Sequence, residues 1–211
     1  RLHIILMVPK GYSPHDTLKH LHACIDFARQ KHVKRIFLHF ITDGRDSPQR
    51  AASHIMHDVL QTIHGPGKNS SDIELVTIMG RFYAMDRAGN WERTRQAYEC
   101  LIDEEVCQKF SHYKLAIEHG YNAGHTDEYM EPMLIDRGKE KSRDSRIKDG
   151  DGIIFNGLRS DRTQQLASAL VQQNFNKENP KSFRRKKVLK NILMCALTTF
   201  GNMVSDRTVT A

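Results

Sequence analysis

The chain has 211 residues, of which 39% are hydrophobic and 27% charged, and its formal net charge is +7. This composition describes a soluble globular protein long enough to bury a core, and it excludes collagen-like and disulfide-dense classes. No apolar run reaches the roughly 18 to 20 residues that a membrane-spanning helix requires, and the basic balance indicates anionic partners, either polyanions or small metabolites.

The four cysteines (Cys24, Cys100, Cys107 and Cys195) are scattered, and no pair has the spacing of a metal site. Three of them lie inside apolar patterns, which is typical of core thiols in a reducing compartment rather than of a disulfide framework. The N-terminal residues lack the charged, apolar and small-residue pattern of a signal peptide. We therefore expect a cytoplasmic protein without a membrane partner.

Strand-length apolar runs alternate with helical patterns along the chain. The runs predict strands over residues 2–8, 35–41, 73–79, 152–155 and 188–197. Apolar residues at helical spacing predict helices over about 16–31, from Pro48, from Trp91, within 108–132 and around 166–170. This alternation implies crossover connections, so the predicted fold is α/β, a three-layer, mainly parallel sheet flanked by helices.

The remaining segments are polar. We predict an exposed loop over residues 137–148 and a flexible basic surface segment over 172–187. The last apolar run ends at residue 197, so the sequence predicts a single domain over 1–197 and a polar tail without packing of its own over 198–211.

Arginines recur in the loops where the predicted strands end. Arg45 follows the second strand, Arg81 and Arg87 follow the third, and Arg159 and Arg162 follow the strand at 152–155. Open α/β sheets bind their ligands at the carboxyl ends of the strands. Because the planar guanidinium donates two parallel hydrogen bonds and keeps its charge, arginine suits phosphate and carboxylate. A single arginine is more often a plain surface residue, but five at strand ends favour an anion site.

Three aspartates accompany these arginines, namely Asp46, Asp86 and Asp161. Each could orient an arginine or accept a hydrogen bond from a ligand hydroxyl. Such a set would hold a small molecule with one phosphate, one carboxylate and a hydroxyl group.

Other motifs indicate less. The segment 65–68 lacks the spacing of a phosphate-binding loop, and the segment 149–151 lacks the glutamate that closes a calcium loop. The basic run 181–190 could contact nucleic acid, but Phe183 is its only stacking residue, which favours a solvated segment.

The arginine motifs together resemble the cofactor-independent (2,3-bisphosphoglycerate-independent) phosphoglycerate mutase family. The matching segments, in the family's order and spacing, are 40–48 (FITDGRDSP), 80–93 (GRFYAMDRAGNWER), 124–129 (GHTDEY), 149–151 (DGD) and 159–162 (RSDR). The segment 80–93 is the most specific of them, and the similarity covers nearly the whole chain.

The resemblance implies an isomerase of glycolysis that interconverts 3-phosphoglycerate and 2-phosphoglycerate through a phosphoserine. Such enzymes have a phosphatase-like domain, with the serine nucleophile and two Mn²⁺ or Mg²⁺ ions, and an inserted α/β domain that holds the phosphoglycerate. This chain is similar to the inserted domain alone, with residues 198–211 as the return linker. The resemblance therefore implies no cofactor in this chain, a phosphatase-like partner domain of the same enzyme, and an inactive isolated chain.

The resemblance also implies roles for single residues. Arg45 and Asp46 would bind the glycerate, Arg81 and Arg87 its phosphate or carboxylate, and Arg159 and Arg162 would clamp the transferring phosphoryl group. The turn after the first strand departs from the family pattern, because Ser13 stands where a substrate-contacting histidine is expected. His15 takes the second histidine position, and it is the candidate catalytic residue.

Two further hypotheses stay open at this point. The substitution at Ser13 would favour a stand-alone phosphometabolite-binding module that has lost catalysis. The net charge and the run from Lys181 would fit a basic nucleic-acid-binding domain, which the single stacking residue disfavours.

Overall fold

The computed structural model describes residues 1–7, 15–64, 72–103, 105–136, 138, 144–156, 160–197 and 208–210. In these residues the strands form one eight-stranded sheet in the order β4-β5-β3-β2-β1-β6-β7-β8. They are β1 (Leu2–Met7), β2 (Ile36–Thr42), β3 (Ile73–Gly80), β4 (Gln108–Phe110), β5 (Met133–Ile135), β6 (Gly152–Asn156), β7 (Leu193–Ala196) and β8 (Thr208–Thr210). All neighbouring strands are parallel except β3 and β5.

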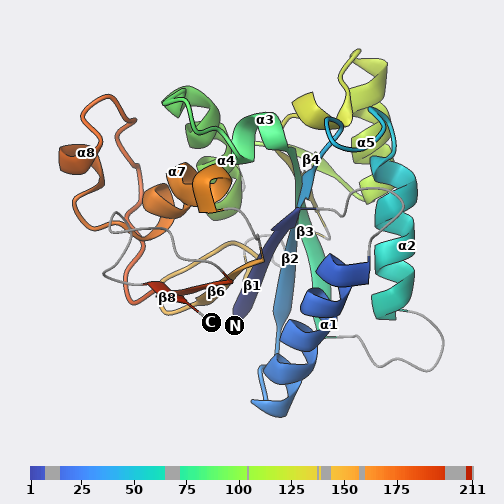
Figure 1. Cartoon of the computed structure of the whole chain (residues 1–211), viewed down its shortest axis with the longest axis horizontal. Helices are drawn as coiled ribbons and strands as arrows, with labels where there is room; N and C mark the ends of the chain where they lie inside the picture. The colour runs from blue at the N-terminus through green and yellow to red at the C-terminus, as the bar shows by residue number, and fades with distance from the viewer. Residues whose placement is uncertain are drawn as a thin grey trace.

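Helices cover both faces of the sheet, so the single domain has three layers (Figure 1). One face carries α1 (His15–Gln30), α2 (Ala52–His64) and α5 (Tyr113–Asn122), and the other carries α4 (Trp91–Ile102), α7 (Ser160–Val171) and α8 (Phe175–Glu178). The short helices α3 (Arg81–Ala84) and η1 (Asp127–Tyr129) lie at the strand ends. The predicted fold class is thus confirmed.

The central strands are buried on both faces, as their continuous apolar runs predict. In β1, Ile4 and Leu6 pack into the core beneath α1, α2 and α5, while Ile5 packs into the core beneath α4 and α7. Strands β1, β2 and β3 run parallel to one another, and α3 follows the end of β3 directly (Figure 1). The edge at which these strands end brings together the loops that carry the arginine motifs.

Helix α2 begins at Ala52, so the prediction that Pro48 opens it is wrong. Oδ2 of Asp127 accepts hydrogen bonds from the backbone nitrogens of Ala51 and Ala52, both at 2.8 Å. These nitrogens belong to the first turn, where backbone N–H groups have no partner within the helix. A residue distant in sequence therefore sets the start of the helix.

Three other segments differ from prediction. Residues 108–132 contain β4, α5 and η1 rather than a helix and a connection. The segment 172–187 contains α8 and buries Phe175 completely, so part of it packs against the domain. In the region predicted as an exposed loop, Arg146 and Ile147 are buried. In the segments 172–187 and 137–148, single buried side chains anchor a polar stretch to the domain, which composition alone does not indicate.

The predicted boundary at residue 197 stays a prediction. Within the tail, however, Thr208–Thr210 form β8 and pair with β7 from Met194 to Ala196. The tail thus adds an edge strand, which its polar sequence did not indicate.

The 3-10 helix η1 is packed directly on two glycines at the strand ends. A Cβ atom on Gly44 would lie 2.5 Å from the backbone nitrogen of Glu128, and Gly44 also has a positive φ of 64°. A Cβ atom on Gly80 would lie 2.4 Å from the carbonyl oxygen of Glu128. Neither approach is possible with a larger residue, so these glycines allow the loops after β2 and β3 to share one support.

A buried polar chain runs from Asp151, directly before β6, across β1, β2 and β3. Oδ2 of Asp151 lies 3.2 Å from Nε2 of His3, whose Nδ1 lies 2.9 Å from Nε2 of His39. Nδ1 of His39 lies 2.8 Å from the hydroxyl of Thr77, and the Arg1 side chain binds Asp151 from outside. Burial lowers the pKa of both imidazoles, and so they are neutral at pH 7.

We predict that Gly80→Ala destabilises the chain by about 1–3 kcal/mol, because the added methyl group collides with the backbone of η1. Urea denaturation would measure this loss. Gly152→Ala is the matched control, because its nearest contact would be an ordinary 3.6 Å to a side-chain carbon of Leu2. Equal stability of the two variants would contradict the packing of η1 on Gly80.

A second prediction concerns pH. The folded-state pKa values of His3 and His39 are lowered, so the unfolded chain binds more protons and stability falls as the pH drops through about 6.5. His39→Gln should flatten this part of the stability profile, measured by denaturation between about pH 7.5 and 5. His54→Gln is the matched control, because the side chain of His54 is 82% exposed.

Candidate functional site

The site begins with a buried arginine at the end of β3. Arg81 is 6% exposed, and its Nη1 donates hydrogen bonds to Oδ1 of Asp43 and, at 2.9 Å, to Oδ2 of Asp46. Asp43 is also buried, whereas the side chain of Asp46 is 42% exposed. Burial alone would lower the pKa of the guanidinium, but the bonds to Asp46 and Asp43 outweigh it and raise this pKa. Arg81 is therefore permanently charged and fixed in place.

Arg45 lies in the same loop as the two aspartates but points outward. Its side chain is 60% exposed, and its nearest carboxylate oxygen belongs to Glu128, at 3.8 Å from Nη1. The loop is closed by the hydrogen bond from the Gly44 nitrogen to Oγ of Ser47, at 3.1 Å. This loop thus carries an exposed arginine together with the two aspartates that bind Arg81.

The loop between α3 and α4 is organised by Asp86, which is 8% exposed. Its Oδ1 accepts hydrogen bonds from the backbone nitrogens of Ala88 and Asn90, and its Oδ2 accepts from Arg93 at 3.1 Å. Burial raises the pKa of this carboxyl, but the hydrogen bonds from Asn90 and Ala88 outweigh it and lower the pKa. Asp86 therefore shapes the loop that carries Arg87, rather than facing a ligand.

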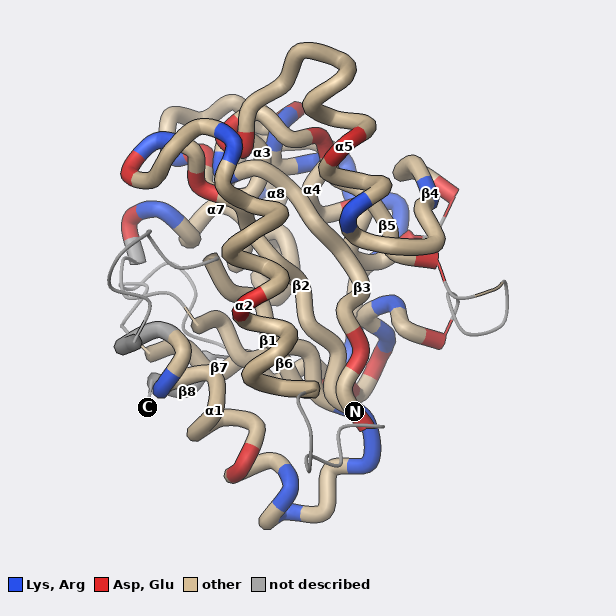
Figure 2. The backbone as a smooth tube through the Cα atoms, turned by 90° about the vertical axis from the view of Figure 1, so that its right-hand side faces the viewer, with Lys and Arg blue, Asp and Glu red and all other residues tan. Residues whose placement is uncertain are grey.

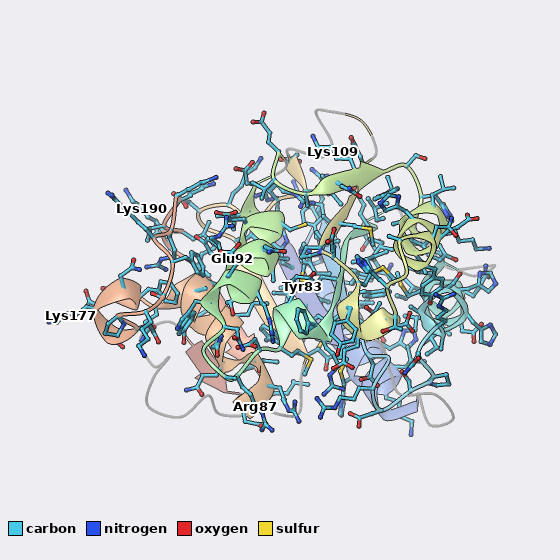
Figure 3. All side chains as sticks on the ribbon, turned by 90° about the horizontal axis from the view of Figure 1, so that it is seen from above. Tyr83, Arg87, Glu92, Lys109, Lys177 and Lys190 are labelled. Carbon is cyan, nitrogen blue, oxygen red and sulfur yellow. The ribbon has the colours of Figure 1, made fainter. Side chains whose placement is uncertain are left out.

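A second arginine cluster joins this loop to the first turn of α7. Nη1 of Arg87 donates to Oδ2 of Asp161 at 2.6 Å, and Nε of Arg162 lies 3.7 Å from the same oxygen. The side chains of Arg87 and Asp161 are half exposed, and that of Arg162 is mostly buried. Figure 3 looks down on this edge, with Tyr83 near its centre and Arg87 toward its lower margin.

The structure does not describe the remaining predicted site residues fully. Arg159 and Ser13 lie outside the described residues. His15 is the first residue of α1, and its side chain also lies outside the description. The structure therefore brings Arg81 together with Asp46, and Arg87 with Arg162, while the roles of His15 and Arg159 stay predictions.

Two residues important to the site were missed in the sequence. Asp43 was part of a matching segment, but its burial against Arg81 could be inferred only from its position directly after a fully buried strand. Asp127 lies in the matching segment 124–129, and it caps α2 and accepts the Tyr121 hydroxyl at 2.5 Å. Its role is to fix the loop of Asp43 and Asp46, which no local pattern reveals.

Both signs of charge occur at this edge. Basic and acidic residues alternate along the backbone near α3 and α7 (Figure 2). The oxygen atoms of an anionic ligand could therefore replace one carboxylate as the hydrogen-bond partner of an arginine. Asp46 and Asp161 are both partly exposed, so the displaced carboxylate could then bind water or a ligand hydroxyl.

Comparison with known proteins agrees with this arrangement. Residues 1–201 match the protein family described as BPG-independent PGAM N-terminus. The chain belongs to the BPG-independent phosphoglycerate mutase family. A relative from Methanosarcina barkeri, 2,3-bisphosphoglycerate-independent phosphoglycerate mutase 1, is 35% identical over 92% of this chain. The mutase of Pyropia yezoensis is 37% identical over 83% of it.

This chain spans about a third of the length of these mutases, 35% and 31% respectively. A crystal structure of Leishmania mexicana phosphoglycerate mutase, determined at low cobalt concentration, shares the fold with a TM-score of 0.74. It is 22% identical in sequence, and the match covers 93% of this chain and 35% of that one. The chain thus corresponds to the N-terminal part of the family.

Two further observations concern other kinds of site. Within the described ranges, no helix is long and apolar enough to cross a membrane, and no three His, Cys, Asp or Glu side chains gather as metal ligands. In the basic run 181–190, Arg185 is buried and donates to the carbonyl oxygens of Ala169 and Gln172 at the end of α7. Part of that run is therefore structural.

We predict that Asp43→Asn costs about 3 kcal/mol of folding stability, because it removes a buried charge that balances Arg81. Chemical denaturation would measure the loss. Asp46→Asn touches the same Arg81 nitrogen from a half-exposed position, so it should cost less than about 1 kcal/mol. A larger loss for Asp46→Asn would show that the buried pair is not the one that fixes Arg81.

Proposed function

We propose that this chain is the substrate-binding part of a phosphoglycerate mutase of glycolysis, which interconverts 3-phosphoglycerate and 2-phosphoglycerate. The reaction would proceed through a phosphoserine on a phosphatase-like domain outside this chain. The proposal rests on the buried Arg81, held by Asp43 and Asp46 at a strand end, in a family whose named members are phosphoglycerate mutases.

The arrangement suits a ligand with two anionic groups. Within the described part of the chain, both hydrogen bonds of Arg81 use Nη1, so Nε and Nη2 can donate to a phosphate or carboxylate. Arg87 and Arg162, joined through Asp161, would hold the second anionic group or the transferring phosphoryl group. Arg159 would join them, and Arg45 would close over the glycerate from its exposed position.

The carboxylates would contribute in a different way. Asp46 is partly exposed beside Arg81, where it could accept a hydrogen bond from a glycerate hydroxyl. During a mutase reaction the glycerate must turn without escaping, and several arginines around it would retain it by charge while individual hydrogen bonds exchange. His15, at the first position of α1, is the proposed catalytic residue of this chain.

The chemistry of the phosphoryl transfer would lie elsewhere. The two Mn²⁺ or Mg²⁺ ions expected for the reaction would be held by the phosphatase-like domain. We expect a cytoplasmic protein with that domain as its partner, and an isolated chain that binds phosphoglycerate without converting it.

Titration calorimetry with 3-phosphoglycerate tests the binding. We expect saturable binding to the 211-residue chain, and a loss of at least about tenfold in affinity for Arg87→Ala, because a charge-assisted hydrogen bond is lost. Arg87 is 52% exposed, so this variant should fold. Lys190→Ala is the control, since Lys190 lies far from Arg87 in Figure 3. No binding by the wild type, or equal weakening by both variants, would contradict the site.

A chimera tests the catalytic part. When this chain replaces the corresponding third of the Methanosarcina barkeri mutase, we expect interconversion of the two phosphoglycerates with Mn²⁺, reduced at least about tenfold by Arg87→Ala. Lys190→Ala should retain the rate. A folded chimera that binds 3-phosphoglycerate but does not isomerise it would favour a non-catalytic binding module instead.

A further inference from the structure

The net positive charge of the chain is concentrated in one segment, residues 177–190. The whole chain contains 32 Lys and Arg residues and 25 Asp and Glu residues. Seven of the basic residues but only one acidic residue lie in this segment, so the rest of the chain, with 25 basic and 24 acidic residues, is almost neutral. The seven are Lys177, Lys181, Arg184, Arg185, Lys186, Lys187 and Lys190. The attraction of the chain for extended anionic surfaces therefore comes mainly from this segment.

Buried groups hold the segment against the domain. The buried guanidinium of Arg185 lies over the ring of Phe175, at 4.9 Å from its centroid. The hydroxyl of Tyr98 donates a hydrogen bond to the carbonyl oxygen of Lys187, and Leu189 is 1% exposed. Because these contacts hold the backbone in place, a partner that binds the segment does not have to order it first.

The other six basic side chains of the segment are exposed. Within the described residues, the one salt bridge that they form joins Nζ of Lys186, whose side chain is 69% exposed, to Oε1 of Glu99 at 4.0 Å. Lys177 and Lys190 lie on the same side of the molecule in Figure 3, away from Arg87. This surface therefore carries accessible positive charge, and it is separate from the proposed anion site.

Two aliphatic side chains are exposed in the segment or directly after it. Val188, which lies between Lys187 and Lys190 in the sequence, is 50% exposed, and Leu193 at the start of β7 is 56% exposed. Exposed apolar side chains beside a cluster of lysines are typical of proteins that bind the surface of an anionic membrane. The charges meet the lipid headgroups, and the apolar groups enter the interface.

A nucleic acid is the alternative polyanion, and the structure favours it less. The only aromatic residue of the segment, Phe183, packs with its ring centroid 5.5 Å from that of Tyr98 and 5.3 Å from that of Phe175. Its ring is thus engaged within the protein, whereas proteins that bind single strands stack bases on exposed aromatic rings. Val188 and Leu193 would also gain nothing from contact with a phosphate backbone.

We infer that the segment 177–190 docks the protein on an anionic lipid surface. The six exposed basic side chains lie among the headgroup phosphates and carboxylates, and Val188 and Leu193 enter the boundary between headgroups and acyl chains. The contact is peripheral and rests on charge together with a small apolar area. It revises the expectation, drawn from the sequence, of a protein without a membrane partner.

Sedimentation of the 211-residue chain with lipid vesicles tests this inference. We expect at least about tenfold tighter binding to phosphatidylcholine vesicles with roughly 30% phosphatidylserine than to vesicles of phosphatidylcholine alone, because only the former carry negative surface charge. Binding should weaken as the NaCl concentration rises from about 0.1 to about 0.5 M, since salt screens the attraction. Equal binding to both kinds of vesicle would overturn the inference.

Charge reversal locates the contact. Lys186→Glu combined with Lys187→Glu should weaken binding to the phosphatidylserine vesicles at least about tenfold. The matched control is Lys109→Glu combined with Lys114→Glu, which changes the net charge equally at exposed lysines of β4 and α5. Equal weakening by the two variants would contradict a contact through this segment. If either variant fails to fold, the wild-type comparison of the two vesicle types decides the matter.

A third variant separates a membrane from a nucleic acid. Leu193→Ser should weaken vesicle binding at least about threefold, because the apolar contact is lost while the charges remain. A DNA duplex that binds the wild-type chain more tightly than the phosphatidylserine vesicles do, with an affinity that Leu193→Ser leaves unchanged, would assign the segment to nucleic acid and refute the membrane contact.

Discussion

The candidate site depends on one close packing contact, that of η1 against the backbone of Gly44 and Gly80. The contact is reinforced by hydrogen bonds from the Thr42 hydroxyl to the Asp127 carbonyl at 2.6 Å and from the Gly80 nitrogen to the Met130 carbonyl at 2.7 Å. The ends of β2 and β3 thus share one rigid support. Arg81 and its two aspartates follow these strand ends and are therefore held in place. A ligand that binds them does not have to order them first, which lowers the entropic cost of binding.

The two arginine clusters differ in how firmly they are held. Arg81 is buried and its position is fixed, whereas Arg87 and Asp161 form an ion pair at the surface that contributes little to folding. A ligand would therefore find one preformed contact and one that can rearrange around it. In a reaction that requires the bound molecule to turn, such a division would keep one end oriented while the other end moves.

The sequence predicted the central strands, the helices that cover them and the grouping of arginines at one edge, because apolar periodicity and strand ends are local features. It could not predict the start of α2, since the cap comes from Asp127, more than 70 residues away. From the sequence, Asp46 but not Asp43 was assigned to the site, and the segment around Arg185 was predicted to be solvated. Burial of a charged side chain depends on partners from other elements, and a single sequence does not identify them.

The polar chain from Asp151 through His3 and His39 to Thr77 has a consequence for how the sheet assembles. Apolar side chains on β1, β2 and β3 could pack almost as well if one strand slid along its neighbour, but these four groups meet only in a single alignment. A shift by one residue would turn His3 to the opposite face and leave buried polar atoms unpaired. This series of polar contacts therefore favours one alignment of the strands over the others.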